Sequence, residues 1–314
     1  MKAIVIEEFG GPEKLTFKDV QTPKPLKNEV LVKVKYAGVN PVDWKIREGL
    51  LASRLPHEFP IILGWDVAGT IAEVGKEVSD LKVGDEVYSY ARKPTVKWGT
   101  YAEYVAIDAK NVVLKPRSIS FAESAAIPLS GLTAWQALFD VAHLQQGETI
   151  LILGGSGGVG SLAIQFAKVA NAKVIATASP KKHSYIKALG VDLAIDHTAN
   201  VLEQVRSFSQ EGVDVVFDCF GKEAFTNGLK ALKKGGRIVS ILEHLDPAVA
   251  QNLGITASYL FVTPNGAQLK QIAELIDAKK VIQQPVEAIP LHEAHIAQEK
   301  LRSGSITGKL VLQV

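Results

Sequence analysis

The chain has 314 residues, 47% of them hydrophobic and 22% charged, and a formal net charge of +2. This balance gives no electrostatic case for binding nucleic acid or an anionic membrane, and the single cysteine, Cys219, excludes an intrachain disulfide or a multi-cysteine metal site. No apolar run approaches the roughly 18 residues of a membrane span. We therefore expect a cytoplasmic protein of about two domains.

The N-terminal third is typical of short β-strands with little helix. Apolar and polar residues alternate in several short runs, and turn residues such as Gly84-Asp85 separate them. The expected strands cover residues 3–7, 15–19, 29–36, 67–74, 86–90 and 100–107. This pattern predicts a small β-rich domain, which on its own is compatible with a barrel or a sandwich.

Three polar-containing stretches interrupt these strands. They are GVNPVDWK (38–45), GWDVAG (64–69) and LKVGDEV (81–87). Asn40 precedes a proline and is therefore held extended, which suits a turn residue that satisfies local backbone groups as well as a functional amide. Asp43 and Asp66 are interpreted first as caps or as partners of a buried basic group.

A glycine-rich turn follows the next clear strand. Residues 149–153 have the length and composition of a buried parallel strand, and apolar residues after the turn recur at helical spacing. In this strand–turn–helix context, the G-x-G-x-x-G pattern predicts a pyrophosphate-binding turn rather than a purely structural one, because a helix N-terminus offers N–H groups to an anion. The residues assigned to it are Gly154, Ser156, Gly157, Gly158, Val159 and Gly160.

From this turn onward, strands alternate with helices. The expected strands cover 173–177, 192–196, 213–218 and 236–242, and the expected helices 181–189, 201–209 and 224–233. Two helical stretches, 122–126 and 131–141, precede the series, and a strand (255–262) with two more helix–strand pairs follows it. The alternation predicts an α/β fold with a doubly wound parallel sheet, whose ligand lies at the carboxyl ends of the strands.

The second strand of the series indicates which nucleotide binds. A site for NADH usually carries Asp or Glu about 20 residues beyond the glycines, to accept a hydrogen bond from the ribose 2′-OH. Here ASPKK (178–182) occupies that place, and no acidic residue follows before Asp192. The hydroxyl of Ser179 and the ammonium group of Lys182 would attract a 2′-phosphate, although paired lysines are also typical of a solvated helix start. The missing acid favours NADPH.

The three polar stretches and the glycine-rich turn, in this order, resemble the medium-chain dehydrogenase/reductase superfamily. Within it they look like the zinc-independent quinone oxidoreductase branch, which includes zeta-crystallin-like and enone-reducing proteins, and the resemblance runs from the MKAIV opening to GKLVL (308–312). Zinc enzymes of the superfamily place a cysteine where Asn40 stands and a histidine where Trp65 stands. Because zinc needs several N or S ligands, these residues predict a site without metal.

The resemblance implies two domains with the active cleft between them. A discontinuous β-rich GroES-like domain would comprise residues 1–115 and 264–314, and a Rossmann domain for NADPH would comprise 116–263. Thr133, which could equally be a helix-start hydroxyl, and His197, where NADPH-using members often carry tyrosine, are implied cofactor contacts. The other implied contacts outside the glycine turn and the second strand are Phe220, Gly221, Leu242, Phe261, Val262 and Lys309.

By the same resemblance, the protein reduces quinones or α,β-unsaturated carbonyl compounds by hydride transfer and forms a homodimer. Without a metal, neutral or cationic donors must meet the charge that grows on the carbonyl oxygen; Asn40 is the first candidate and Lys45 the second, and no proton donor is assigned. The expected walls of the substrate pocket are Trp65, Tyr88 and Phe261. The alternatives are an enoyl-thioester reductase of the same superfamily and a non-catalytic NADPH-binding sensor or crystallin-like protein.

Overall fold

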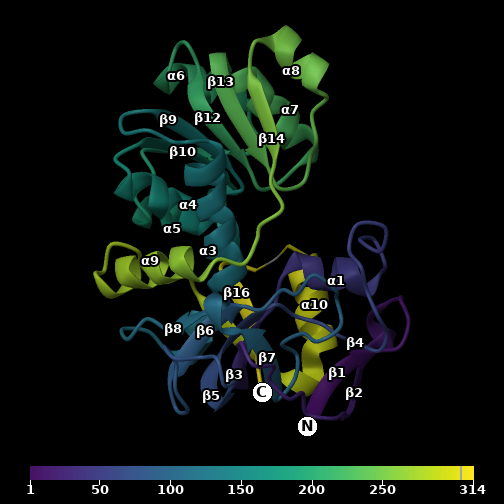
Figure 1. Cartoon of the computed structure of the whole chain (residues 1–314). Helices are drawn as coiled ribbons and strands as arrows, with labels where there is room; N and C mark the ends of the chain where they lie inside the picture. The colour runs from purple at the N-terminus through teal and green to yellow at the C-terminus, as the bar shows by residue number, and fades with distance from the viewer. Residues whose placement is uncertain (305) are drawn as a thin grey trace. The chain divides into compact units, whose positions relative to one another are not determined.

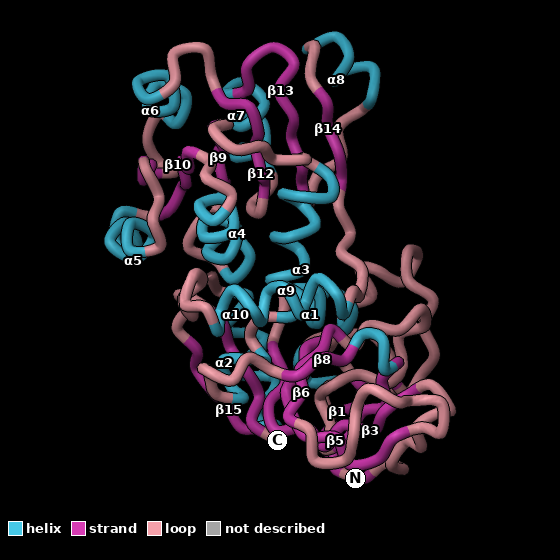
Figure 2. The backbone as a smooth tube through the Cα atoms, turned by 60° about the vertical axis from the view of Figure 1, so that its left-hand side comes forward, coloured by secondary structure: helices cyan, strands magenta, loops and turns pink. Residues whose placement is uncertain are grey.

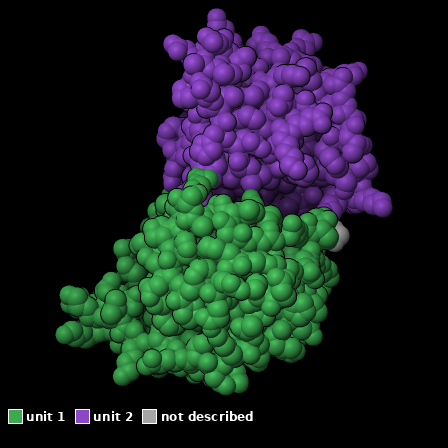
Figure 3. Space-filling model, turned by 90° about the vertical axis from the view of Figure 1, so that its right-hand side faces the viewer, with its two compact units in different colours: residues 1–129, 263–278, 283–314 green, residues 130–262, 279–282 purple. Residues whose placement is uncertain are grey.

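A computed structural model of the protein describes residues 1–304 and 306–314. It divides the chain into two compact units, which Figure 3 colours separately. Unit 1 comprises Met1–Leu129, Thr263–Ala278 and Gln283–Val314, and unit 2 comprises Ser130–Val262 and Lys279–Ile282. Unit 1 is therefore assembled from segments on both sides of unit 2 in the sequence.

Unit 2 is built on a six-stranded parallel sheet (Figures 1 and 2). In chain order its strands are β9 (Thr149–Leu153), β10 (Lys173–Ala178), β11 (Leu193–Asp196), β12 (Val213–Asp218), β13 (Leu232–Ser240) and β14 (Thr256–Tyr259). Their spatial order is β11-β10-β9-β12-β13-β14, so the direction of winding reverses at β9. This order is that of dinucleotide-binding folds, which bind their ligand at the carboxyl ends of the strands beside that reversal. The predicted doubly wound sheet is confirmed.

Helices cover both faces of this sheet. They are α4 (Gly158–Val169), α5 (His183–Ala188), α6 (Val201–Phe208), α7 (Lys222–Ala231) and α8 (Pro247–Leu253), with a 3₁₀ turn η4 (Pro180–Lys182) before α5. Right-handed crossovers place α4 and α5 on one face and α6 and α7 on the other. Val205 of α6 and Phe225 of α7 pack with Leu151 and Ile195 of the sheet in one buried core. The chain enters unit 2 through α3 (Pro128–Trp135) and a π-helical turn, η3 (Gln136–Val141).

Unit 1 contains a seven-stranded sheet and a three-stranded sheet. The larger sheet runs β15 (Val286–Pro290), β16 (Lys309–Gln313), β3 (Glu29–Gly38), β5 (Asp66–Val74), β6 (Glu86–Tyr90) and β8 (Val112–Leu114), and β7 (Tyr104–Asp108) also pairs with β3. The smaller sheet contains β2 (Thr16–Asp19), β1 (Lys2–Ile6) and β4 (Ile61–Ile62). Antiparallel pairing aligns Val311 of β16 with Gly38 of β3, so residues far apart in sequence complete one sheet.

Few helices belong to unit 1. They are α1 (Pro41–Arg47), α2 (Phe121–Ala125), α9 (Gly266–Asp277) and α10 (Ala294–Arg302), with 3₁₀ turns η1 (Pro12–Lys14), η2 (Ala109–Asn111) and η5 (Leu291–Glu293). The predicted β-rich character of the N-terminal part is confirmed. No helix of the described residues is both long and apolar enough to cross a membrane.

Two helices were not expected from the periodicity of the sequence. Helix α1 begins after Asn40, with Pro41 at its first position and Asp43 at its third, where the carboxylate accepts the backbone N–H of Asn40. Helix α8 begins in the same way, with Asp246 as its cap and Pro247 at its first position. A capping residue followed by proline is a recognised helix start, so the signal was present in the sequence although each helix is too short to show periodicity.

Two expected strands are shorter than predicted. The strand predicted at 100–107 begins at Tyr104, and the strand predicted at 255–262 ends at Tyr259. Phe261 and Val262 therefore follow β14 instead of lying within it.

Candidate active site

The glycine-rich turn after β9 is shaped by backbone crowding. Gly154 has φ +87°, a conformation that residues with a side chain rarely adopt. A Cβ atom on Gly160 would lie 2.3 Å from the carbonyl oxygen of Gly154, so only glycine allows α4 to pack this closely on the turn. At Gly157 the nearest atom to an added Cβ would be 3.5 Å away. Gly160 is thus required by packing inside the protein, whereas the space in front of Gly157 is open to a ligand.

The N-terminus of α4 lies directly at this turn. Gly157 is the N-cap residue, and no side chain among the described residues caps the helix. The first N–H groups of an α-helix have no partner within the helix, and the helix dipole adds partial positive charge there. The N–H groups of Gly158, Val159 and Gly160, next to Ser156, therefore form a site suited to a pyrophosphate.

Three further predicted cofactor residues follow the two strands on one side of β9. Ser179 is the N-cap residue of the 3₁₀ turn η4 after β10, and Lys182 ends that turn. Ala178 of β10 is aligned with Asp196 of β11, and the backbone N–H of His197 lies 3.4 Å from the carbonyl oxygen of Ala178. The ends of β10 and β11 thus bring Ser179, Lys182 and His197 to the same edge of the sheet.

On the other side of β9, two polar residues hold the loops that carry predicted contacts. Asp218, at the end of β12, is buried and accepts the backbone N–H groups of Phe220 at 3.0 Å and Gly221 at 2.8 Å. Ser240, at the end of β13, donates to Asp218 at 2.6 Å and accepts the N–H of Leu242 at 3.1 Å. Asp218 and Ser240 therefore position these loops, a role that the sequence did not reveal.

Asp196, a carboxylate that was not among the predicted site residues, lies at this edge. Asp196 ends β11 and accepts hydrogen bonds from the backbone N–H and the hydroxyl of Thr198, which lower the pKa of its carboxyl group. Its Oδ1 atom lies 3.9 Å from Nδ1 of His197, whose ring is 6.3 Å from that of Phe220. An acid therefore lies beside the groups expected to bind a 2′-phosphate.

Thr133 and Cys219 of unit 2 are both surrounded by protein. Thr133 is buried within α3, which begins at Pro128, so it is not a helix-start residue. Cys219 follows β12, and burial, with a smaller effect of the neighbouring Asp218 charge, raises the pKa of its thiol well above the usual value. A thiol with a raised pKa stays protonated and is a poor nucleophile.

In unit 1, Asn40 lies at the centre of a buried polar cluster. Its side-chain Nδ2 donates to Oδ2 of Asp66 at 2.8 Å, and its Oδ1 accepts from the ammonium group of Lys309, which also donates to the carbonyl oxygen of Val39 at 2.8 Å. A lysine only donates and an ionised carboxylate only accepts, so these partners fix the orientation of the amide. Lys309, expected at the cofactor, is instead buried in unit 1 against Asn40.

Two carboxyl groups of this cluster titrate close to neutral pH. Asp43 accepts the hydroxyl of Tyr101 at 2.8 Å as well as the N–H of Asn40, and Asp66 accepts the N–H of Leu129 at 2.7 Å. Burial raises the pKa of Asp43 to about 7 and that of Asp66 to about 6, against the lowering effect of these hydrogen bonds and of the lysine. Burial also lowers the pKa of Lys309. The cluster therefore gains or loses protons in the physiological range.

The other residues predicted in unit 1 have different surroundings. The ammonium group of Lys45 lies 5.8 Å from the ring centroid of Trp44, and partial burial lowers its pKa. Trp65 is buried, directly before Asp66 in the sequence. The ring of Tyr88 is fully buried, and its hydroxyl donates to the carbonyl oxygen of Leu269 at 2.6 Å. Tyr88 therefore holds α9, and the structure gives it this packing role in place of a pocket wall.

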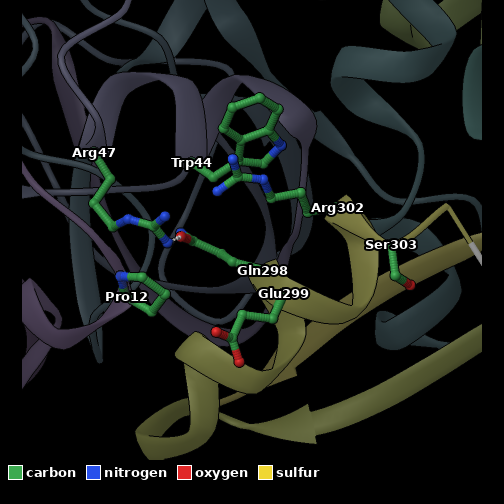
Figure 4. A pocket seen from close by; sticks show the side chains of 7 residues that line it. All are labelled: Pro12, Trp44, Arg47, Gln298, Glu299, Arg302 and Ser303. Carbon is green, nitrogen blue, oxygen red and sulfur yellow. Dashed lines mark hydrogen bonds between the residues drawn. The ribbon is translucent and has the colours of Figure 1, made fainter.

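A cavity of about 270 Å³ lies between α1 and α10 of unit 1 (Figure 4). The guanidinium group of Arg47 donates to Gln298 at 2.5 Å and to Glu48 at 2.9 Å, and that of Arg302 donates to Glu48 at 2.6 Å while lying over the ring of Trp44. The cavity is lined by Pro12, Trp44, Arg47, Gln298, Glu299, Arg302 and Ser303. None of these residues was predicted for the site, and their contacts tie α1 to α10.

Two protein-family models match the chain, one in its N-terminal part and one in its C-terminal part. The family model described as an alcohol dehydrogenase GroES-like domain matches residues 26–117, and the model described as a zinc-binding dehydrogenase matches residues 189–312. Among the described residues, no group of three or more His, Cys, Asp and Glu side chains is arranged to hold a metal ion. The predicted GroES-like domain is confirmed.

Curated and structurally characterised relatives cover almost the whole chain. An NADPH-dependent alkenal/one oxidoreductase, chloroplastic, from Arabidopsis thaliana is 36% identical over 99% of this chain and 79% of the relative. A 2-methylene-furan-3-one reductase from Solanum lycopersicum shows the same identity and coverage. The solved structure of the quinone oxidoreductase from Coxiella burnetii is 35% identical, with a TM-score of 0.88, over 100% of this chain and 99% of that one.

Proposed function

This chain belongs to the quinone and enone oxidoreductase branch of the medium-chain dehydrogenase/reductase superfamily, and from that premise we propose that it uses NADPH to reduce quinones or α,β-unsaturated carbonyl compounds. The observation that carries the proposal is the 36% identity, over 99% of the chain, with an enzyme named as an NADPH-dependent alkenal/one oxidoreductase. The other two relatives support the same substrate classes. They favour this function over an enoyl-thioester reductase or a non-catalytic NADPH-binding protein.

The residues of unit 2 fit NADPH. The uncapped N-terminus of α4, with N–H groups of Gly158 and Val159, is suited to the pyrophosphate. Ser179, Lys182 and His197, at the ends of β10 and β11, are suited to the 2′-phosphate. When bound, NADPH supplies the hydride. Contacts with its nicotinamide are proposed for Thr133, Phe261 and Val262.

We propose that the reduction needs no zinc. The support is the chemistry of the side chains, because Asn40 and Trp65 occupy the positions at which zinc enzymes of the superfamily carry ligands. The charge that grows on the substrate oxygen must then be met by hydrogen-bond donors. Asn40 is the proposed donor, since its Nδ2 carries a second N–H beyond the one given to Asp66. Lys45 is the second candidate.

The proposal is tested by following the loss of NADPH absorbance with a panel of quinones and short enones. We expect turnover with at least one member and a lower rate with NADH. A protein that binds NADPH, as seen by fluorescence, but oxidises it with no member of the panel would overturn the proposed activity.

We also propose a homodimer located in the cytoplasm. The lone Cys219 suits a reducing compartment, and β14 forms one edge of the six-stranded sheet, where a second copy can pair. Light scattering after size-exclusion chromatography tests the dimer, and a mass of one chain would overturn it. Cell fractionation tests the location, because the relative from Arabidopsis thaliana is named as chloroplastic.

A further inference from the structure

A metal-free reductase needs a strong donor for the oxygen that becomes negative. In this protein the amide of Asn40 is already held at both ends, by Lys309 and by Asp66. A single remaining N–H of a neutral amide is a modest substitute for a cation, because hydrogen bonds from charged donors are roughly twice as strong as those from neutral ones. The ammonium group of Lys309 is buried and already donates to Asn40 and Val39, so a second cation is needed to donate to the substrate oxygen.

Arg92 supplies a cation in this part of unit 1. It is the second residue after β6, and its guanidinium carbon lies 5.7 Å from the ring centroid of Trp65. The ring of Trp65 in turn packs edge-on against that of Tyr90, at 5.9 Å and 71°. Tyr90 is aligned with Asp66 in the pairing of β5 and β6, and Asp66 holds Asn40. Facing residues of an antiparallel pair lie on the same side of the sheet about 5 Å apart, so Arg92 belongs to the surroundings of the Asn40 cluster.

The pKa of the Tyr90 hydroxyl reflects the effect of the Arg92 charge on an oxygen atom near Trp65. That hydroxyl is buried and makes no hydrogen bond of good geometry within the described residues. Burial raises the pKa of Tyr90, whereas the charge of Arg92 lowers it, and the charges of Asp66 and Asp43 raise it. Arg92 is therefore close enough to stabilise a negatively charged oxygen beside Trp65, where two nearby carboxylates oppose it.

We propose that Arg92 is a catalytic residue, which donates hydrogen bonds from its guanidinium group to the carbonyl oxygen of the substrate. This inference rests on the proposed function. As hydride bonds to the β-carbon of an enone, the electrons of the C=C bond move towards the carbonyl and an enolate oxygen forms; water then supplies the proton to the α-carbon, and the cofactor is left oxidised. The guanidinium group is a planar cation with several N–H donors, a geometry that suits a carbonyl or enolate oxygen.

Arg92 suits this role better than Lys45, the cation considered first. The ammonium group of Lys45 lies against Trp44, which lines the cavity between α1 and α10. Arg92 instead lies against Trp65, the neighbour of Asp66 in the sequence.

The test compares Arg92→Met with Arg92→Lys and with a matched control, Lys97→Met. Lys97 also lies over an indole ring, that of Trp98 at 5.4 Å, and pairs with Glu58. Loss of one oxyanion donor lowers kcat by about 100- to 1,000-fold in known cases, so we expect kcat of Arg92→Met to fall by about 100-fold with an enone, Arg92→Lys to keep part of the rate, and Lys97→Met to match the wild type. NADPH affinity, measured by fluorescence, should be unchanged.

Chemical rescue distinguishes an Arg92 that donates hydrogen bonds to the substrate from an Arg92 that only packs against Trp65. In Arg92→Ala, methylguanidinium at millimolar concentration should restore part of kcat, whereas methylammonium and sodium chloride at equal concentration should not. Turnover of Arg92→Met within threefold of the wild type, or a lost rate in Arg92→Ala that no guanidinium compound restores, would overturn the assignment. If the wild type itself turns over no substrate of the panel, the proposed function fails instead, so the two failures are distinguishable.

Discussion

The amide of Asn40 and the carboxylate of Asp66 share a buried hydrogen bond of 2.8 Å, with the ammonium group of Lys309 on the opposite end of the same amide. The side chain of Asn40 thus lies between a cation and an anion that come from different strands. It both separates these charges and satisfies their hydrogen-bonding groups, so we expect a change at this position to affect stability as well as the proposed turnover.

Replacing Asn40 with alanine should lower kcat with enones or quinones by on the order of 100-fold, as expected for the loss of a donor to the carbonyl oxygen. NADPH affinity should be retained, because the glycine-rich turn belongs to unit 2. Steady-state kinetics and a fluorescence titration measure the two effects. Unchanged kcat in a folded variant would remove Asn40 from the mechanism.

Gly160 and Gly157 should respond differently to alanine. A Cβ on Gly160 would meet the carbonyl oxygen of Gly154 at 2.3 Å, so Gly160→Ala should distort the turn, lower the melting temperature and abolish NADPH binding. The matched variant Gly157→Ala meets nothing nearer than 3.5 Å and should keep its stability while binding NADPH more weakly. Thermal denaturation and fluorescence titration test the pair, and equal loss of stability in both would contradict this assignment.

Ser179 and Lys182 should set the preference for NADPH. A hydrogen bond to a charged group contributes about 1.5–3 kcal/mol, so the double replacement by alanine should weaken binding of 2′,5′-ADP by at least about 10-fold and leave 5′-AMP unaffected. Lys181→Ala, on the same turn and exposed, is the control. Calorimetry with the two nucleotides gives the result, and an unaltered ratio of affinities would show that other residues bind the phosphate.

Asp43 should make stability depend on pH. Its carboxyl has a pKa of about 7 in the folded protein against a usual value of 3.8, so the folded state binds the proton more tightly than the unfolded chain. This contribution is complete below about pH 4 and is lost as the pH rises through 7. Asp43→Asn cannot ionise and keeps an acceptor for the hydroxyl of Tyr101. Between pH 5 and 8, the wild type should therefore lose on the order of 2 kcal/mol of unfolding free energy relative to this variant.

Urea denaturation of both proteins at the two pH values measures this difference. Parallel changes in the two proteins would mean that the carboxyl of Asp43 is ionised throughout this range.

Tyr88→Phe should affect stability and spare catalysis. The hydroxyl donates to the carbonyl oxygen of Leu269 in α9, and loss of this buried hydrogen bond should cost about 1 kcal/mol. Since Tyr88 is fully buried, kcat and KM should match those of the wild type. A raised KM for the substrate would return Tyr88 to the pocket wall.

The sequence predicted unit 2 more completely than unit 1, for a physical reason. Strands covered on both faces, such as β9, are continuous apolar runs, and glycines mark the turn that follows. Helix α1 has seven residues, which is too short for a periodic pattern, and only its capping residues reveal it. Local sequence patterns therefore identified the alternating strands and helices of unit 2. They missed short helices such as α1, whose only signal is a capping residue followed by proline.

The contacts of the Asn40 cluster could not be predicted from local sequence patterns, because they join residues that are far apart in the sequence. Tyr101 is 58 positions from Asp43, and Lys309 is 269 positions from Asn40. Only the pairing of β16 with β3 brings Lys309 to Asn40. Arg92, in the sequence Ala91-Arg92-Lys93, is typical of a solvated end of a strand, and its position over Trp65 emerges only from the folded sheet.

The placement of β16 has a consequence for synthesis on the ribosome. At about 10 residues per second, roughly half a minute separates the emergence of Asn40 from that of Lys309, 269 positions later. During this time Asp43 and Asp66 lack their buried cation, and β3 lacks β16 beside it. The segment of unit 2 from Ser130 to Val262 emerges within that interval. All of unit 2, which ends at Ile282, has therefore been synthesised before unit 1 receives its last strand, β16.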